Sequence, residues 1–132
     1  MTVRVVLDTS ALLAYSRMEG LAVGELVNSV AEDPGSIVGI PAASYLAAHA
    51  QLSGDERGLL VRLVTAIDGV TAILPLLGTD TVEVADLDAR SAKHAGLGHA
   101  IVETRKHGAA LATYLGQQAR GDLDEDDVLD LV

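Results

Sequence analysis

The 132-residue sequence has no cysteine, no tryptophan and no phenylalanine, and its only aromatic residues of the Phe, Tyr and Trp type are three tyrosines. The absence of cysteine excludes disulfides, zinc–thiolate sites and a cysteine nucleophile, and it is typical of a reducing compartment. Apolar residues make up 49% of the chain. The core therefore has to be built from many small aliphatic contacts, with few aromatic anchors.

Basic residues and long apolar runs are also scarce. Nine lysines and arginines stand against 19 aspartates and glutamates, so the net charge is −10, which counts against unaided binding to nucleic acid. No apolar stretch reaches the roughly 20 residues of a membrane span, and Asp8 interrupts the first apolar run too early for a signal peptide. We expect a soluble, cytoplasmic protein that does not contact membranes.

Hydrophobic periodicity predicts one domain, residues 1–132, in which strands alternate with helices. Strands are expected at 3–7, 36–40, 70–76 and 109–114, with a short edge strand in 127–132. Helices are expected at 10–17, 20–32, 41–52, 53–67, 81–95 and 97–107. This alternation predicts parallel strands with helices on both faces of the sheet.

Several residues mark where these helices begin and end. Ser53 with Glu56 forms a capping-box pattern, and Asp80 with Glu83 resembles a second one. Pro41 suits the first position of a helix. Gly108 suits the end of the helix that precedes it.

Asp8 follows the first predicted strand, in the stretch VRVVLDTSALLAY, and has two interpretations of about equal weight. It can be a helix N-cap whose carboxylate accepts from free backbone N–H groups. It can also be a ligand for a hard cation such as Mg²⁺ or Mn²⁺. Since ligands bind at the carboxyl ends of parallel strands, Asp8 and Thr113 are expected to share one edge of the sheet.

Three other acidic or phosphate-binding site types are disfavoured. A receiver domain needs a carboxylate after a later strand, and the third strand ends in LPLLG. A haloacid-dehalogenase-type site needs two aspartates one residue apart, whereas Asp8 is followed by Thr9 and Ser10. The sequence GLGHA at 96–100 lacks the rest of any glycine-rich phosphate fingerprint.

Three segments together resemble the PIN domain family over nearly the whole chain: VVLDTSALLAY, IVGIPAASYLAAHAQ and LGHAIVETRKHGAALATY. The family includes the toxin ribonucleases of toxin–antitoxin pairs. The resemblance implies a three-layer α/β/α fold with a central parallel sheet of four or five strands. It also implies a homodimer, for which the apolar helix 41–52 is a candidate surface, and an antitoxin-like protein partner.

Active members of that family hold one or two Mg²⁺ or Mn²⁺ ions with three or four acids and cut RNA with a metal-activated water. Asp8 matches the first acid. By the family's spacing, the second, third and fourth acids would stand at Ala47, Gly96 and Leu115. A single carboxylate retains a divalent ion poorly, so the resemblance implies an impaired metal site with Asp8 as its only retained acid.

The hydroxyl-bearing residues that line the family's site, Ser10 and Thr113, are retained. His99 is a further pocket-lining candidate, although a role on the helix surface is the alternative that we favour. Glu103 is expected to face solvent or its basic neighbours. A substitute metal site made of Asp8, His99 and Glu103 is an alternative of low weight.

Other titratable residues point less directly to a site. His49 lies on the side of its helix opposite Ala47. Glu25 and Asp86 belong to amphipathic helices and are expected on solvated faces. Much of the acidic excess lies in the terminal stretch GDLDEDDVLDLV, for which a solvated end is favoured over a contact with a basic partner.

Two functions follow from these observations. The first is a PIN-like domain that has lost ribonuclease activity and acts as an interaction or regulatory module. The second is a divergent endoribonuclease of the toxin–antitoxin type that depends on Mg²⁺ or Mn²⁺ and draws its acids from other positions. RNA is a partner only in the second case.

Overall fold

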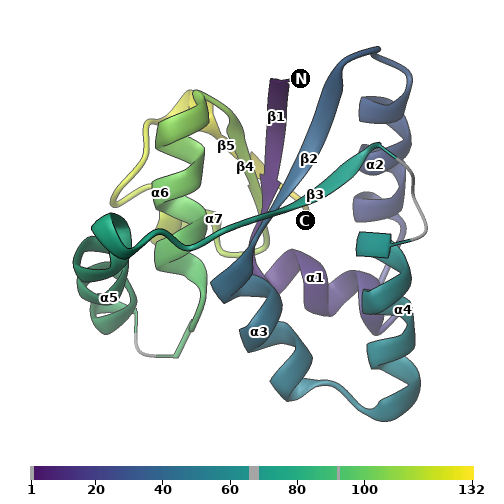
Figure 1. Cartoon of the computed structure of the whole chain (residues 1–132), viewed down its shortest axis with the longest axis horizontal. Coiled ribbons are helices and arrows are strands. Elements are labelled where there is room, and N and C mark those ends of the chain that lie inside the picture. The colour runs from purple at the N-terminus through teal and green to yellow at the C-terminus, as the bar shows by residue number, and fades with distance from the viewer. Residues whose placement is uncertain (1, 66–68, 92) are drawn as a thin grey trace.

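The computed structural model describes residues 2–65, 69–91 and 93–132. Five parallel strands form one sheet in the order β3-β2-β1-β4-β5, which confirms the predicted α/β class (Figure 1). The strands are β1 (Thr2–Leu7), β2 (Ser36–Pro41), β3 (Thr71–Leu74), β4 (Ala110–Thr113) and β5 (Val128–Asp130). The short edge strand expected near the end of the chain is therefore present.

Helices cover both faces of this sheet, as the alternating pattern predicts (Figure 1). One face packs against α1 (Thr9–Ser16), α2 (Ala22–Ala31), α3 (Ala42–Gln51) and α4 (Gly54–Thr65). The other packs against α5 (Thr81–Arg90), α6 (Leu97–His107) and α7 (Gly116–Ala119). Two short 3-10 helices, η1 (Gly78–Asp80) and η2 (Glu125–Asp127), complete the described elements.

The two halves of the core meet at β1. Val6 faces the α5–α6 side and Leu7 faces the α1–α4 side, and both are fully buried. A register shift between Val3 and Val5 places these two valines on opposite faces as well. Because β1 is central and buried on both faces, its residues from Val3 to Leu7 are all apolar except Arg4.

The predicted boundaries are mostly correct to within a few residues. The Ser53–Glu56 capping box is confirmed, because each side chain meets the other residue's backbone N–H. Gly108 ends α6 in a left-handed conformation with φ of 59°, as expected. The predicted end of the fourth helix at 66–67 lies outside the described residues.

Three boundary predictions are wrong. Pro41 is extended (ψ 136°) and pairs with Leu74, so it ends β2 instead of opening α3. Asp80 makes no capping hydrogen bond because its carboxylate binds the Lys106 ammonium. Helix α5 ends at Arg90, five residues early, and the chain then turns toward α6; residue 92 in this stretch lies outside the described residues.

No helix in the described part of the chain has the length and hydrophobicity that crossing a membrane requires.

Candidate functional site

Asp8 lies between the end of β1 and the start of α1 and is fully buried. Its Oδ1 accepts hydrogen bonds from the Ala11 backbone N–H at 3.0 Å and from the Ser10 hydroxyl at 2.7 Å. Its Oδ2 accepts from the Thr113 hydroxyl at 2.6 Å. The N-cap interpretation therefore describes the geometry, and two hydroxyl donors complete the environment of the carboxylate.

The two hydroxyl groups connect Asp8 to the backbone that follows β4. The Tyr114 N–H donates to the Ser10 hydroxyl at 3.0 Å, and the Leu115 N–H donates to the Thr113 hydroxyl at 2.8 Å. Each hydroxyl thus accepts from the backbone and donates to the carboxylate. Two parallel chains of hydrogen bonds join β4 to β1 and α1 at the carboxyl edge of the sheet.

Burial raises the pKa of the Asp8 carboxyl above its ordinary value of 3.8. The hydrogen bonds from Thr113, Ser10 and the Ala11 N–H oppose this effect because they stabilise the ionised form. The carboxylate can accept about four hydrogen bonds, and three of these positions are filled by the protein. Little capacity remains for an additional ligand.

A cavity of about 150 Å³ opens beside this network. Among the described residues that line it, Asp8 is the only carboxylate, and Lys93 and His94 bring basic groups to the cavity. The lining comprises Asp8, Thr9, Ser10, Leu13, Gln51, Lys93, His94, Ala95, Leu97 and Leu115. A hard divalent cation needs several oxygen ligands with negative charge, so this lining does not fit Mg²⁺ or Mn²⁺.

Position 96, where the resemblance expects the third acid, is sterically closed. Gly96 has φ of 92°, and a Cβ built on it would lie 2.3 Å from the Thr9 Oγ1 and 2.8 Å from the Ser44 Cα. The surroundings are fixed by hydrogen bonds: the Ser44 hydroxyl donates to the Gly96 carbonyl, and the Thr9 hydroxyl donates to the Ala95 carbonyl. A side chain at this position would require the starts of α1, α3 and α6 to move apart.

The start of α6 is also already capped. The Asp88 carboxylate accepts from the Gly96 N–H at 3.2 Å and from the Gly98 N–H at 2.7 Å. This carboxylate neutralises the partial positive charge at the helix N-terminus from outside the cavity. The positions where the resemblance expects the second and fourth acids are occupied by Ala47 and Leu115. Ala47 is half-buried, and Leu115 is an apolar residue that lines the cavity.

His99 does not line the cavity and is not on the helix surface, because its side chain is fully buried. Its Nδ1 accepts from the Ala43 N–H at 3.1 Å, and its Nε2 lies 3.1 Å from the Glu103 carboxylate. An acceptor at Nδ1 leaves the proton on Nε2, so His99 is a neutral imidazole that donates to Glu103. The favoured surface role for His99 is therefore wrong.

Glu103 was expected to face solvent or its basic neighbours: the solvent alternative is wrong, because the side chain is 3% exposed, whereas the contact with basic Lys106 is present. Its carboxylate lies 3.3 Å from the His107 Nε2 and 3.8 Å from the Lys106 Nζ, in addition to His99. With both ring nitrogens of His99 engaged, the substitute site of Asp8, His99 and Glu103 is not formed. Within the described ranges, no three His, Asp or Glu side chains are grouped so that they could hold a metal.

The other titratable candidates lie away from the cavity. Glu25 and Asp86 are exposed, as expected. His49 is half-buried, with its ring centroid 5.8 Å from that of Tyr45. In the acidic terminal stretch, Asp124 to Asp126 and Asp130 are exposed, and Glu125 and Asp130 both pair with Arg120, at 2.8 Å and 2.6 Å.

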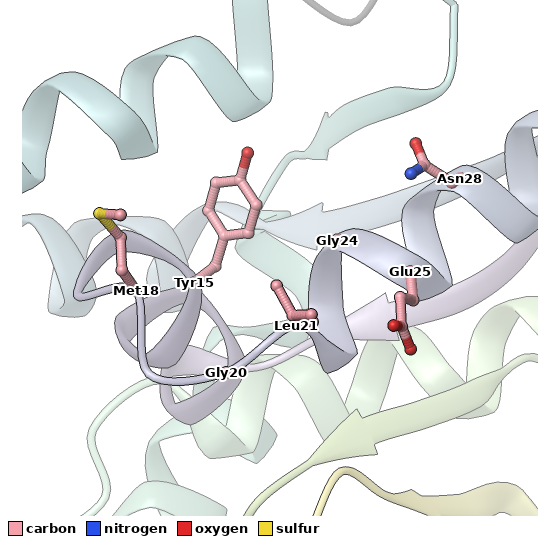
Figure 2. A pocket seen from close by; sticks show the side chains of 7 residues that line it. All are labelled: Tyr15, Met18, Gly20, Leu21, Gly24, Glu25 and Asn28. Atoms are coloured by element: carbon pink, nitrogen blue, oxygen red, sulfur yellow. The ribbon is translucent and has the colours of Figure 1, made fainter.

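A second, larger hollow of about 420 Å³ lies between the end of α1 and the start of α2 (Figure 2). Its lining is mostly apolar or small, and its one charged residue is Glu25: Tyr15, Met18, Gly20, Leu21, Gly24, Glu25 and Asn28. It shares no residue with the cavity beside Asp8. Among its described lining residues, Glu25 and Tyr15 are the titratable ones.

Sequence reasoning missed two features of the site. Lys93 and His94 line the cavity although they were placed inside a predicted helix, which ends earlier than its apolar pattern indicates. The contact of Thr9 and Ser44 with Gly96 joins three helix starts far apart in the sequence, and no local pattern signals it.

Comparison of the sequence with models of protein families finds no match, and comparison with curated proteins also finds none. The fold and the geometry of the site therefore carry the functional argument.

Proposed function

We propose that this chain is a PIN-like domain that has lost metal-dependent ribonuclease chemistry and acts as an interaction or regulatory module. The observation that carries the proposal is the state of the carboxyl edge of the sheet. Asp8 is buried at this edge and engaged by three internal donors, and position 96 has no room for a side chain. A nuclease site of this type needs clustered acids at these positions.

The parallel five-stranded sheet supports the PIN-like part of the proposal. The two most specific resembling segments, 5–15 and 97–114, meet at the hydrogen bond between Asp8 and Thr113. Ser10 joins the same network at 3.3 Å from the Thr113 hydroxyl. In this proposal Asp8, Ser10 and Thr113 no longer hold an ion. The fold is retained because their hydrogen bonds connect β1, α1 and β4.

The charge balance supports a role through protein contacts. A net charge of −10 repels RNA, and Lys93 is the only lysine or arginine among the lining residues for which the structure gives positions. Leu46 on α3 is 67% exposed, so this helix offers an apolar surface. We propose a second copy of the chain as the partner, with an antitoxin-like protein as the alternative.

The retained Asp8, Ser10 and Thr113 favour a second candidate, a divergent Mg²⁺- or Mn²⁺-dependent endoribonuclease. The two functions are separated by incubating structured and unstructured RNA with the wild-type protein in Mg²⁺, Mn²⁺ or EDTA. Asp8→Asn is the matched variant because it keeps the shape of the side chain and an N-cap acceptor.

We expect no metal-dependent cleavage by either protein and no metal-induced increase in melting temperature. Cleavage by the wild type that requires Mn²⁺ or Mg²⁺ and disappears in Asp8→Asn would establish the nuclease instead. Cleavage that persists in Asp8→Asn and in EDTA identifies a contaminating ribonuclease, and the assay is then repeated on protein purified further.

A further inference from the structure

The hollow between α1 and α2 encloses about 420 Å³, which lies within the range of small-molecule sites. Figure 2 shows Tyr15 and Met18 on one side of it, and Glu25 and Asn28 on α2 on the other. Leu21 lies between the two groups. Because none of these residues lines the cavity at the carboxyl edge of the sheet, a ligand in this hollow would bind independently of that cavity.

The apolar side chains at this hollow are highly exposed. Met18 is 77% exposed and Leu21 is 76% exposed, and among the large apolar residues that the structure describes only the terminal Val132 is more exposed. The Tyr15 ring beside them is half-buried. An apolar group placed in the hollow would remove these side chains from water, which is favourable.

Met18 also has an unfavourable backbone conformation. Its φ is 56°, and no other non-glycine residue in 2–65, 69–91 and 93–132 has a positive φ. The Glu19 N–H donates to the Ala14 carbonyl at 2.9 Å, so the chain turns here at the end of α1, where glycine is the usual residue. Methionine is less favourable than glycine in this conformation. A ligand would explain its presence, because a flexible thioether adapts to apolar surfaces of varied shape.

Gly24 opens the backbone of α2 to the same hollow. It lies inside the helix without a positive φ, and a Cβ built on it would meet no atom within 4 Å. Neither the backbone conformation nor packing within the chain therefore requires glycine at this position. The missing side chain lets a ligand approach the helix closely, and a larger residue would fill the space instead.

The charges indicate which ligand fits. Glu25 is the one charged residue among the described lining residues, and the Asn28 amide and the Tyr15 hydroxyl add oxygens that accept hydrogen bonds. The net charge of −10 attracts cations and repels anions. A protein partner fits less well, because the lining comes from residues 15–28 alone, whereas a protein interface usually takes roughly 20–30 residues from each side.

We propose that the hollow between α1 and α2 binds a small organic cation that consists of an apolar body and one ammonium group. The body packs on Tyr15, Met18 and Leu21 above Gly24, and the ammonium group lies toward Glu25. This inference goes beyond the proposed role as an interaction module and does not rest on it.

The first test compares three indole compounds of similar size. Their side chains end in an ammonium group (tryptamine), a hydroxyl (tryptophol) or a carboxylate (indolepropionate). Because the chain has no tryptophan, the indole fluorescence of each compound reports its binding to the full chain. We expect tryptamine to bind about five- to tenfold more tightly than indolepropionate, with tryptophol between them. Indolepropionate binding as tightly as tryptamine, or no binding of tryptamine at about 10 mM, would overturn the proposal.

A charge variant separates the two parts of the ligand. Glu25→Gln should weaken tryptamine binding about two- to fivefold, which is the effect of losing one exposed ion pair, and should leave tryptophol binding unchanged. An equal effect on both compounds, or none on either, would mean that Glu25 does not hold the ammonium group.

A second pair of variants locates the site. Gly24→Leu should weaken tryptamine binding at least about tenfold, because leucine fills the hollow. Gly58→Leu is the matched control: Gly58 also lies inside a helix, α4, with no atom within 4 Å of a Cβ, but it does not line the hollow. Its binding should equal that of the wild type. Equal binding by both variants and the wild type would place the ligand elsewhere and overturn the proposal.

Circular dichroism and melting temperature establish that these variants are folded. Leu21→Ser keeps the proposal testable should Gly24→Leu fail to fold, because Leu21 is exposed; it should weaken tryptamine binding about threefold through lost apolar contact. A peptide of leucine and lysine tests the other occupant. Displacement of tryptamine by this peptide at a lower concentration than unlabelled competitor tryptamine requires would assign the hollow to a protein partner instead.

Discussion

The Thr113 hydroxyl donates a 2.6 Å hydrogen bond to Oδ2 of Asp8 and so joins residues that are 105 positions apart in the sequence. The same hydroxyl accepts from the Leu115 N–H, so it has partners on both sides. Both residues are fully buried. Loss of this one oxygen would therefore leave a carboxylate oxygen and a backbone N–H without their partners in a place from which water is largely excluded.

We expect Thr113→Val, which keeps the shape of the side chain, to lower the free energy of unfolding by about 2–4 kcal/mol. Thr2→Val is the control, because Thr2 is exposed at the start of β1, and it should change stability by less than about 0.5 kcal/mol. Urea unfolding measures both. Equal stability of the two variants would show that the network at Asp8 does not stabilise the fold.

The raised pKa of Asp8 predicts a characteristic pH dependence. The folded chain holds the Asp8 proton more tightly than the unfolded chain, whose carboxyl titrates near 3.8. As pH rises from that value through the raised pKa of the folded state, this group therefore lowers the free energy of unfolding. Below pH 3.8 the Asp8 carboxyl does not lower the free energy of unfolding. Above the raised pKa of the folded state, its destabilising effect is fully present.

Asp8→Asn removes this titration. We expect the stability of the wild type minus that of Asp8→Asn to fall as pH rises from about 3.8 through the raised pKa of the folded state, because burial of the ionised carboxylate is then unfavourable only in the wild type. Chemical unfolding at several pH values measures this difference. A difference that rises with pH would mean that the hydrogen bonds, and not burial, dominate the pKa.

Asp33→Asn provides a control with the opposite sign. A hydrogen bond from Ser36, together with Arg4, lowers the pKa of the exposed Asp33. The wild type should therefore gain stability relative to Asp33→Asn as pH rises toward 3.8, and the difference should be flat above it.

The closed junction at Gly96 predicts a strong effect of a small substitution. Gly96→Ala should cost about 2–5 kcal/mol, because it combines a positive φ with contacts to Thr9 and Ser44 well below van der Waals distance. Gly108→Ala shares the positive φ but meets no atom within 4 Å, so it should cost only about 1 kcal/mol. Thermal unfolding separates the two. Similar costs for both would mean that position 96 can accommodate a side chain, and the argument for a lost third acid would fail.

The buried pair of His99 and Glu103 predicts non-additive substitutions. His99→Leu alone should cost about 3 kcal/mol, because it removes a donor from a buried carboxylate and the acceptor of the Ala43 N–H. The double variant His99→Leu with Glu103→Leu should cost clearly less than the sum of the two single variants. Additive effects in a double-mutant cycle would show that the two side chains do not interact.

The pattern of apolar residues was sufficient to predict the α/β class, the five strands and most helices. Periodicity reports burial directly in two elements: VVL before Asp8 is apolar on every residue because β1 is covered on both faces, and the buried Val23, Val27 and Val30 follow the helical repeat of α2. Local capping was predictable where partners are three residues apart, as for Ser53 and Glu56. The absence of a cap at Asp80 was not predictable, because the lysine that binds its carboxylate, Lys106, is 26 residues away in the sequence.

The sequence alone thus determined most of the segments that form strands and helices, that Asp8 follows the first strand, and that Ala47, Gly96 and Leu115 are not acids. Only the tertiary structure decided what these residues do. Asp8 is held by a threonine from another strand, Gly96 is enclosed by two other helix starts, and His99 is buried against Glu103 and α3. The physical reason is that secondary structure follows from interactions between near neighbours in the chain, whereas the burial and hydrogen bonding of a polar side chain depend on groups that only folding brings within 3 Å.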